Sequence, residues 1–192
     1  MRGVFALALL AIAAPMARAD GDDSPQLDGG ERTHRLNLRI GVSNTDTNGR
    51  PTICMEVTAY RSLSVEGCGT GSGLLHSESG AELAHFRAKW SFFEADTGSG
   101  TLRTQVAAGF AELQLDADEP GFVFGKPDDA EPIEVAGPES SLSVQWLSPL
   151  GDDFELVSNV NAGLAWLPHA GELVVPQSRL QTFISLEVGV GW

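Results

Sequence analysis

The strongest constraint on the fold is a period of two in the apolar residues, which recurs along most of the chain. Between residues 33 and 43 the apolar side chains are Leu36, Leu38, Ile40 and Val42, and polar residues or glycine separate them. Successive side chains of a β-strand point to opposite faces, so this pattern predicts a strand with one apolar face. Further segments with this period lie at 51–66, 82–95, 101–110, 140–148, 152–166 and 179–192. We find no amphipathic helical pattern, so the sequence predicts an all-β protein.

Residues 1–19 have the features of a secretory signal peptide. Arg2 precedes an apolar run from Val4 to Ala14, and Ala17-Arg18-Ala19 is a typical cleavage motif. The apolar run is shorter than the roughly 18 residues that a membrane-spanning helix needs. We therefore expect an exported protein.

Residues 20–31, DGDDSPQLDGGE, are acidic and rich in glycine, and they predict a disordered leader before a β-barrel domain at 32–192.

Two of the 12 basic residues lie in the signal, which leaves 10 Lys and Arg against 26 Asp and Glu, a net charge of −16. This charge excludes a basic nucleic-acid surface. No apolar run after the signal is long enough for a membrane helix. A lipid anchor would need a cysteine at the cleavage site, whereas the first cysteine is Cys54. A soluble β-protein and a membrane β-barrel remain.

The connections between the predicted strands favour the membrane barrel. The connections SNTDTNGRP, ADTGSG and SPLGDD are short, and those at 67–81, 117–139 and 168–178 are long. If the strands alternate in direction, all short connections lie at one end, as they do in outer-membrane barrels. The chain therefore resembles the small bacterial outer-membrane β-barrel proteins, and its end, LEVGVGW, resembles the terminal strand that barrel-insertion machinery recognises.

The resemblance implies a closed antiparallel up-and-down transmembrane β-barrel of about eight strands in the outer membrane of a Gram-negative bacterium. Its implied partners are outer-membrane lipid and the barrel-insertion machinery, which would bind through the C-terminal strand. Aromatic residues on the apolar face should then form girdles at the two membrane interfaces. Counted from the short turns, the aromatics fall into two groups about 23 Å apart. The predicted interface aromatics are Trp90, Phe92, Phe110, Trp146, Phe154, Trp166 and Trp192.

The origin of the eighth strand stays open at this stage, because seven strands are evident and bacterial single-chain barrels have an even number. A turn at Arg61 would split 51–66 into two arms, with Cys54 facing Cys68 across a hairpin. Against this turn, TAYRSLS contains no Gly, Pro, Asn or Asp to make a tight turn, and the split would spoil the loop asymmetry. Otherwise the strand comes from 20–31 or 117–139, and the two cysteines lie about 46 Å apart along one strand.

The polar face of the strands predicts a lumen filled by ion pairs. An eight-stranded barrel is just wide enough to be filled by side chains, and buried charges must be paired. Arg39, Glu56, Lys89 and Glu187 point inward at similar distances from the short-turn end. We expect one charge network from these residues and a structural or surface-interaction function. A narrow channel that repels cations or is gated is the alternative for the lumen.

Two other functions compete with this interpretation. One is a soluble exported β-sandwich or barrel that binds a ligand. The other is an outer-membrane lipid hydrolase that uses the 66–87 loop, which holds Cys68, His76, Ser77, Glu82 and His85. These residues match no known catalytic or metal-binding spacing, and the acidic loop 117–139 has no calcium-binding repeat. We therefore expect no enzymatic activity, catalytic residues, metal site or cofactor.

Two structural expectations test the barrel. Residues 33–43 and 179–192 should be antiparallel neighbours that close it. The apolar residues of these two strands should be exposed in the isolated chain, because lipid would cover them. These residues are Leu36, Leu38, Ile40, Ile184, Leu186, Val188 and Val190.

Overall fold

The structure is a computed structural model of the whole chain. It describes residues 35–46, 50–60, 62–70, 80–115, 122, 124 and 133–192. The predicted signal peptide, the acidic leader and most of the acidic loop 117–139 lie outside the described residues.

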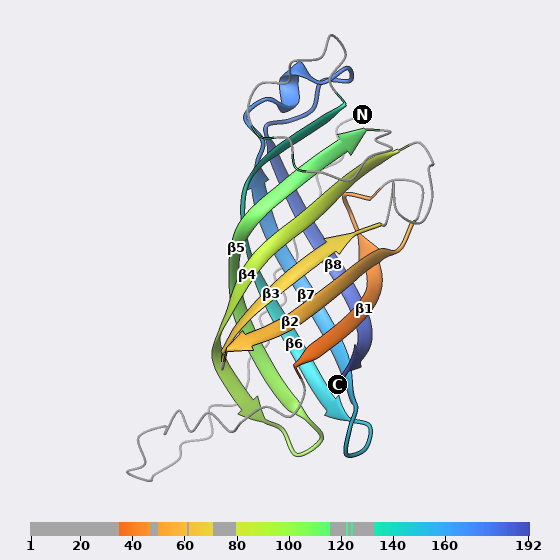
Figure 1. Cartoon of the computed structure of the whole chain (residues 1–192), viewed down its shortest axis with the longest axis vertical. Coiled ribbons are helices and arrows are strands. Elements are labelled where there is room, and N and C mark those ends of the chain that lie inside the picture. Colours follow the sequence, from red (N-terminus) through yellow and green to blue (C-terminus); the bar gives the residue numbers. More distant parts are fainter. Residues whose placement is uncertain are drawn as a thin grey trace, which may run out of the picture.

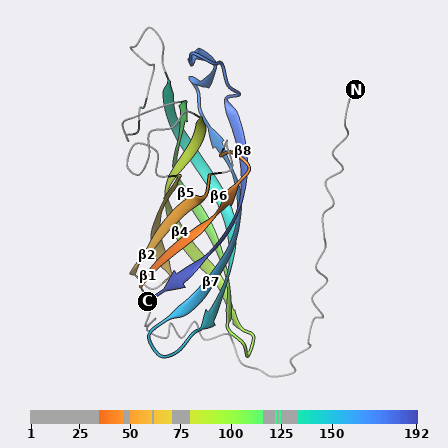
Figure 2. The same cartoon turned by 90° about the vertical axis from the view of Figure 1, so that its right-hand side faces the viewer.

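Eight antiparallel strands form one closed up-and-down barrel, which confirms the predicted fold class (Figures 1 and 2). Each strand pairs with the next in sequence, and the last pairs with the first. The only helical element in the described ranges is the short 3-10 turn η2, Ala170–Glu172, and none of the described residues form a helix long and apolar enough to cross a membrane. The strands are β1 (Leu36–Ser43), β2 (Thr52–Tyr60), β3 (Leu63–Gly69), β4 (Ala81–Asp96), β5 (Thr101–Leu115), β6 (Glu134–Pro149), β7 (Glu155–Trp166) and β8 (Leu180–Gly191).

The pairing of β1 with β8 closes the barrel as the sequence predicts, with Leu38 opposite Val190 and Arg39 opposite Gly189. A Cβ atom on Gly189 would lie 1.9 Å from the carbonyl oxygen of Leu38. Gly41, on the other strand, has an equally close backbone neighbour, because its Cβ would lie 2.0 Å from the carbonyl oxygen of Leu186. The two glycines thus let the strands approach closely at this seam.

The eighth strand comes from the split of residues 51–66. The strands β2 and β3 form a hairpin in which Cys54 lies opposite Cys68, and the two sulfurs form a disulfide. The register shifts between Thr58 and Tyr60, so an irregularity in the strand accommodates a turn that no Gly, Pro, Asn or Asp marks in the sequence.

The split preserves the loop asymmetry, so the objection raised from the sequence is wrong. The connections 61–62, 97–100 and 150–154 lie at the same end as Trp192, and the turns after β4 and β6 are visible at the bottom of Figure 1. The connection 44–51, which the sequence analysis placed with the short turns, lies at the opposite end. The other connections at that end are 70–80, 116–133 and 167–179.

The polarity of this barrel is inverted relative to a soluble protein. Outward-facing apolar side chains are exposed, and Leu186 for example keeps 55% of its surface, whereas inward-facing polar and charged side chains are buried. Of the seven residues predicted to be exposed on β1 and β8, six are exposed and Leu36 is half-buried.

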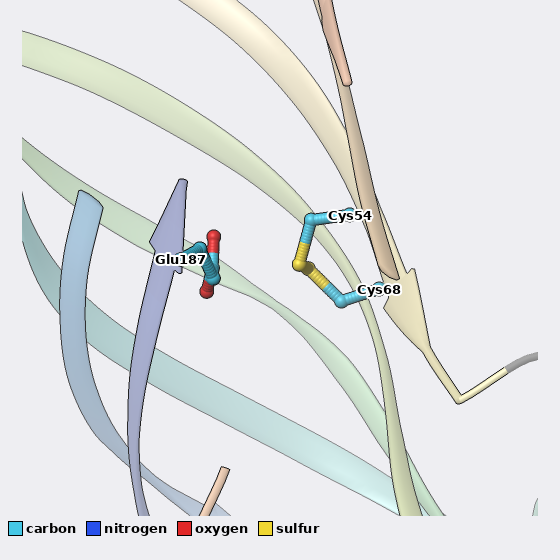
Figure 3. Close-up of side chains that lie close together, drawn as sticks. All are labelled: Cys54, Cys68 and Glu187. Carbon is cyan, nitrogen blue, oxygen red and sulfur yellow. A yellow bond between two sulfur atoms is a disulfide. The ribbon is translucent and has the colours of Figure 1, made fainter. Parts of the chain in front are cut away.

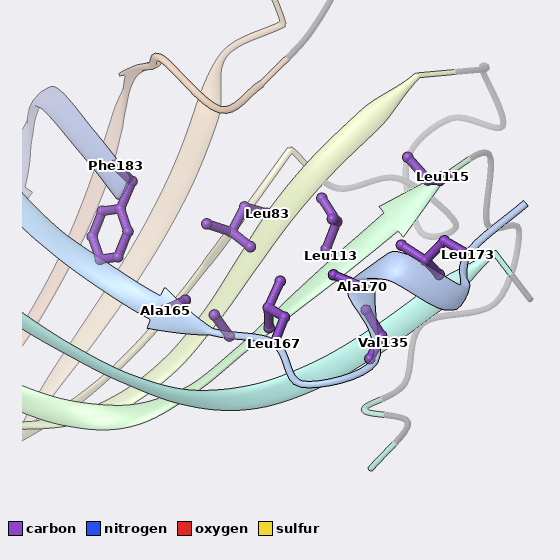
Figure 4. Close-up of a cluster of buried hydrophobic side chains, with 10 residues drawn as sticks. Leu83, Leu113, Leu115, Val135, Ala165, Leu167, Ala170, Leu173 and Phe183 are labelled. Carbon is purple, nitrogen blue, oxygen red and sulfur yellow. The ribbon is translucent and has the colours of Figure 1, made fainter. Parts of the chain in front are cut away.

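An apolar cluster lies at the long-connection end of the barrel, where residues 167–173 pack against the strands β4–β8 (Figure 4). Its members are Leu83, Ala111, Leu113, Leu115, Val135, Ala165, Leu167, Ala170, Leu173 and Phe183. These apolar side chains are buried at that end, and Arg87 adjoins them, with its guanidinium carbon 5.6 Å from the centre of the Phe183 ring.

Candidate functional site: the lumen charge network

Arg39 on β1 is at the centre of the buried charges. Its Nε lies 2.8 Å from an oxygen of Glu187 on β8, and its Nη1 lies 2.9 Å from an oxygen of Glu56 on β2. Its Nη2 donates to Glu66 on β3. Because the planar guanidinium offers five N–H donors, one side chain can join three strands around the barrel seam.

Lys89 and Arg87 on β4 complete the network. The Nζ of Lys89 lies 3.0 Å from Glu56 and 2.7 Å from Glu66, and the Nε of Arg87 lies 2.6 Å from Glu66. The structure therefore brings together Arg39, Glu56, Lys89 and Glu187, the four residues proposed from the sequence. With Arg87 and Glu66 added, three bases face three carboxylates, and Arg87 also has a more distant fourth carboxylate, Glu139, 3.8 Å from its Nη1.

Glu66 was not predicted from the sequence, although this residue accepts hydrogen bonds from all three bases. Glu66 lies directly opposite Glu56 across the β2–β3 hairpin. It also has the same inward parity as Glu56 in the sequence, and this parity would have identified it once the hairpin was accepted.

Neutral side chains saturate the remaining carboxylate oxygens. Glu56 accepts from the hydroxyl of Ser64 at 2.6 Å and from the amides of Gln105 at 3.1 Å and Gln145 at 2.8 Å. Glu187 accepts from Asn159 at 3.0 Å and from Ser185 at 2.6 Å. A buried ion pair is stable only when such additional hydrogen bonds satisfy its remaining polar atoms.

The Cys54–Cys68 disulfide faces Glu187 inside the lumen (Figure 3). The two sulfurs and a carboxylate oxygen of Glu187 lie within 4.8 Å of one another, which is a spacing that could hold a metal ion. In the oxidised protein the sulfurs are bonded to each other and Glu187 carries hydrogen bonds from Arg39, Asn159 and Ser185. Metal binding would therefore require both reduction of the disulfide and loss of these hydrogen bonds.

Two residues of the hydrolase hypothesis, Cys68 and His85, are cross-strand partners on β3 and β4. Cys68 is in the disulfide, and His85 is buried with its Nδ1 2.6 Å from Glu139 and its ring 4.5 Å from that of Phe183. Glu82 accepts a hydrogen bond of 2.6 Å from the backbone N–H of Thr70. His76 and Ser77 lie outside the described residues. Among the described residues of this hypothesis, His85 therefore has a carboxylate partner in Glu139, but the sulfur of Cys68 is not a free thiol.

Asp46 lies in the connection between β1 and β2, at the long-connection end. The hydroxyl of Thr52 donates to its carboxylate. Burial raises the pKa of Asp46 above its ordinary value, and this effect exceeds the opposing effect of the Thr52 hydrogen bond.

The predicted interface aromatics all point outward. Trp90, Phe92, Phe110, Trp146, Phe154, Trp166 and Trp192 each keep between 44% and 53% of their surface exposed. Phe93 is exposed on the same face, and the sequence analysis missed it because a register shift between Ser91 and Phe93 turns two successive residues outward.

No family model matches the sequence, and neither the curated proteins nor the solved structures give a match.

Proposed function

We propose that the protein is an outer-membrane β-barrel of a Gram-negative bacterium, exported by its N-terminal signal and inserted by the barrel-insertion machinery. Its function is structural or one of surface interaction, and it is not an enzyme. The wall contacts outer-membrane lipid, and the lumen is an ion-paired core.

The inverted polarity of the wall carries this proposal. Leu38, Leu142 and Val160, on three different strands, are each roughly half exposed, and none of them packs in a protein core. Burying apolar surface is worth about 25 cal/mol per Å², so a wall of this kind in water would be strongly unfavourable. Acyl chains supply the apolar surroundings that this wall needs.

The contents of the lumen favour a structural function over a pore. The ion pairs of Arg39 and Lys89 with Glu56 occupy the lumen beside the β2–β3 hairpin. The apolar cluster around Leu83 occupies the interior at the end with the long connections. A conducting pore needs a continuous hydrated path, whereas Gln105 on β5 and Gln145 on β6 hydrogen-bond across the barrel to Glu56 on β2.

The two ends of the barrel support a surface function. The long connections all emerge from one end, and 167–173 folds there over the apolar cluster. In outer-membrane barrels the longer connections face the outside of the cell. These connections are therefore the proposed surface for external contacts.

Expression of the full chain in a Gram-negative host tests the proposal. We expect the protein in the outer-membrane fraction, resistant to extraction by carbonate or urea, and with faster gel mobility before boiling than after. A protein found in the soluble periplasmic fraction without detergent would contradict the proposal and would indicate the soluble ligand-binding barrel instead.

A further inference from the structure

Two phenylalanines from the connection between β5 and β6 lie against the outer wall of the barrel. The ring of Phe124 lies 5.0 Å from that of Phe110 in an edge-on arrangement, and the ring of Phe122 stacks on Phe124 at 6.2 Å. Phe110 is the cross-strand partner of Phe86 on β4. We call these four residues the Phe patch.

The Phe patch lies well below the rim of the barrel. Phe110 precedes the end of β5 at Leu115 by five residues, and the backbone N–H of Leu115 donates to the carbonyl of Ile133 at 2.7 Å. A tilted strand climbs roughly 2.5 Å per residue, so the patch lies about 13 Å below the rim. Phe122 and Phe124 therefore lie beside the wall, whereas 167–173 covers the apolar interior at this end.

All four rings of the Phe patch are open to the surroundings. The exposed fraction is 52% for Phe86, 47% for Phe110, 40% for Phe122 and 56% for Phe124. Phenyl rings offer no hydrogen-bond donor or acceptor, so the patch can bind only an apolar partner. Further down the same two strands the outward face continues with Trp90 and Val106, which are also exposed, so the patch is continuous with the apolar wall.

We propose that Phe122 and Phe124 insert into the outer leaflet and, with Phe86 and Phe110, bind the acyl chains of its lipid. This inference rests on the proposed outer-membrane location and adds a membrane-inserted element that is not a strand. Acyl chains fit the patch better than a protein partner does, because the patch continues into the lipid-facing wall with no polar rim between them.

Fluorescence quenching in vesicles tests the insertion. Phe124→Cys is labelled with a polarity-sensitive dye while the Cys54–Cys68 disulfide stays closed, and the protein is reconstituted in phosphatidylcholine vesicles. We expect blue-shifted emission and stronger quenching by a nitroxide at the fifth acyl carbon than by aqueous iodide. Phe122→Cys should behave in the same way and provides an independent reading if Phe124→Cys folds poorly.

Two control positions separate the possible failures. Leu142→Cys, on the wall of β6, should be quenched most by a nitroxide deep in the acyl chain, and Val175→Cys, exposed between β7 and β8, should be quenched by iodide. Iodide quenching at 122 and 124 with lipid quenching at 142 would overturn the insertion alone. Iodide quenching at 142 as well would overturn the outer-membrane proposal.

Discussion

Glu66→Gln should destabilise the barrel far more than its nearly unchanged volume suggests. Glu66 keeps 1% of its surface and accepts hydrogen bonds from Arg39, Arg87 and Lys89. The substitution removes the one carboxylate that all three bases share, and Arg87 then keeps only the more distant Glu139, which lies 3.8 Å from its Nη1 and already contacts His85. Breaking a buried pair in this way costs about 3–5 kcal/mol, and loss of the repulsion between Glu66 and Glu56 offsets part of this cost.

The measurement is the free energy of unfolding in urea, followed by tryptophan fluorescence on protein refolded into vesicles. With a slope of about 1–3 kcal/mol per M, a loss of about 3 kcal/mol lowers the urea midpoint by roughly 1–3 M. Glu172→Gln is a suitable control, because its pair with His169 is 28% exposed on the imidazole side and 41% exposed on the carboxylate side and should be worth at most about 1 kcal/mol.

A second substitution tests whether charge balance is the cause. Lys89→Met combined with Glu66→Gln removes one base together with one acid, so the net charge of the lumen returns to that of the wild type. We expect the double variant to be more stable than Glu66→Gln alone. A loss below about 1 kcal/mol for Glu66→Gln, or no recovery in the double variant, would refute the dry, charge-balanced lumen.

Three further changes test other parts of the structure. Replacing Cys54 and Cys68 by serine should lower the free energy of unfolding by about 3 kcal/mol, because their bond closes a loop with a sequence separation of 14, and urea denaturation with and without reductant checks this. Gly189→Val should prevent the fast-migrating gel form, because its side chain would collide with the carbonyl of Leu38, whereas Val175→Ala should leave gel mobility unchanged. Asp46→Asn should be more stable than the wild type at neutral pH, and this advantage should disappear on acidification. The reason is that a carboxyl group whose pKa is raised in the folded state destabilises the fold as the pH rises through that pKa. Unfolding measured at several pH values between 4 and 7 checks the trend.

The sequence predicted the barrel because one face of every strand is apolar. This period of two can be recognised before it is known which strands pair with each other. The same parity placed Arg39, Glu56, Lys89 and Glu187 inside the lumen. Parity alone does not reveal where a strand bends back. The turn at 61–62 has no Gly, Pro, Asn or Asp, and a shift in strand register takes the place of turn chemistry.

The hairpin at Arg61, which the sequence left open, explains the other errors. Because its two arms could not be identified as separate strands, the pairing of Cys54 with Cys68 stayed open, Glu66 was not paired with Glu56, and the connection 44–51 was assigned to the wrong end of the barrel. The outward position of Phe93 was missed for a related reason, because an irregularity in β4 changes the parity of the residues after it. These features depend on register, which forms only when neighbouring strands meet.

The ion pair between Arg39 and Glu187 joins residues 148 positions apart in sequence, on the first and the last strand. Before these strands meet, Arg39 lacks one of its three carboxylates and the interior remains accessible to water. Pairing of β1 with β8 neutralises the charges and excludes the water in the same step, so each process favours the other. The barrel should therefore close in a single cooperative transition, and intermediates with seven docked strands should be scarcely populated.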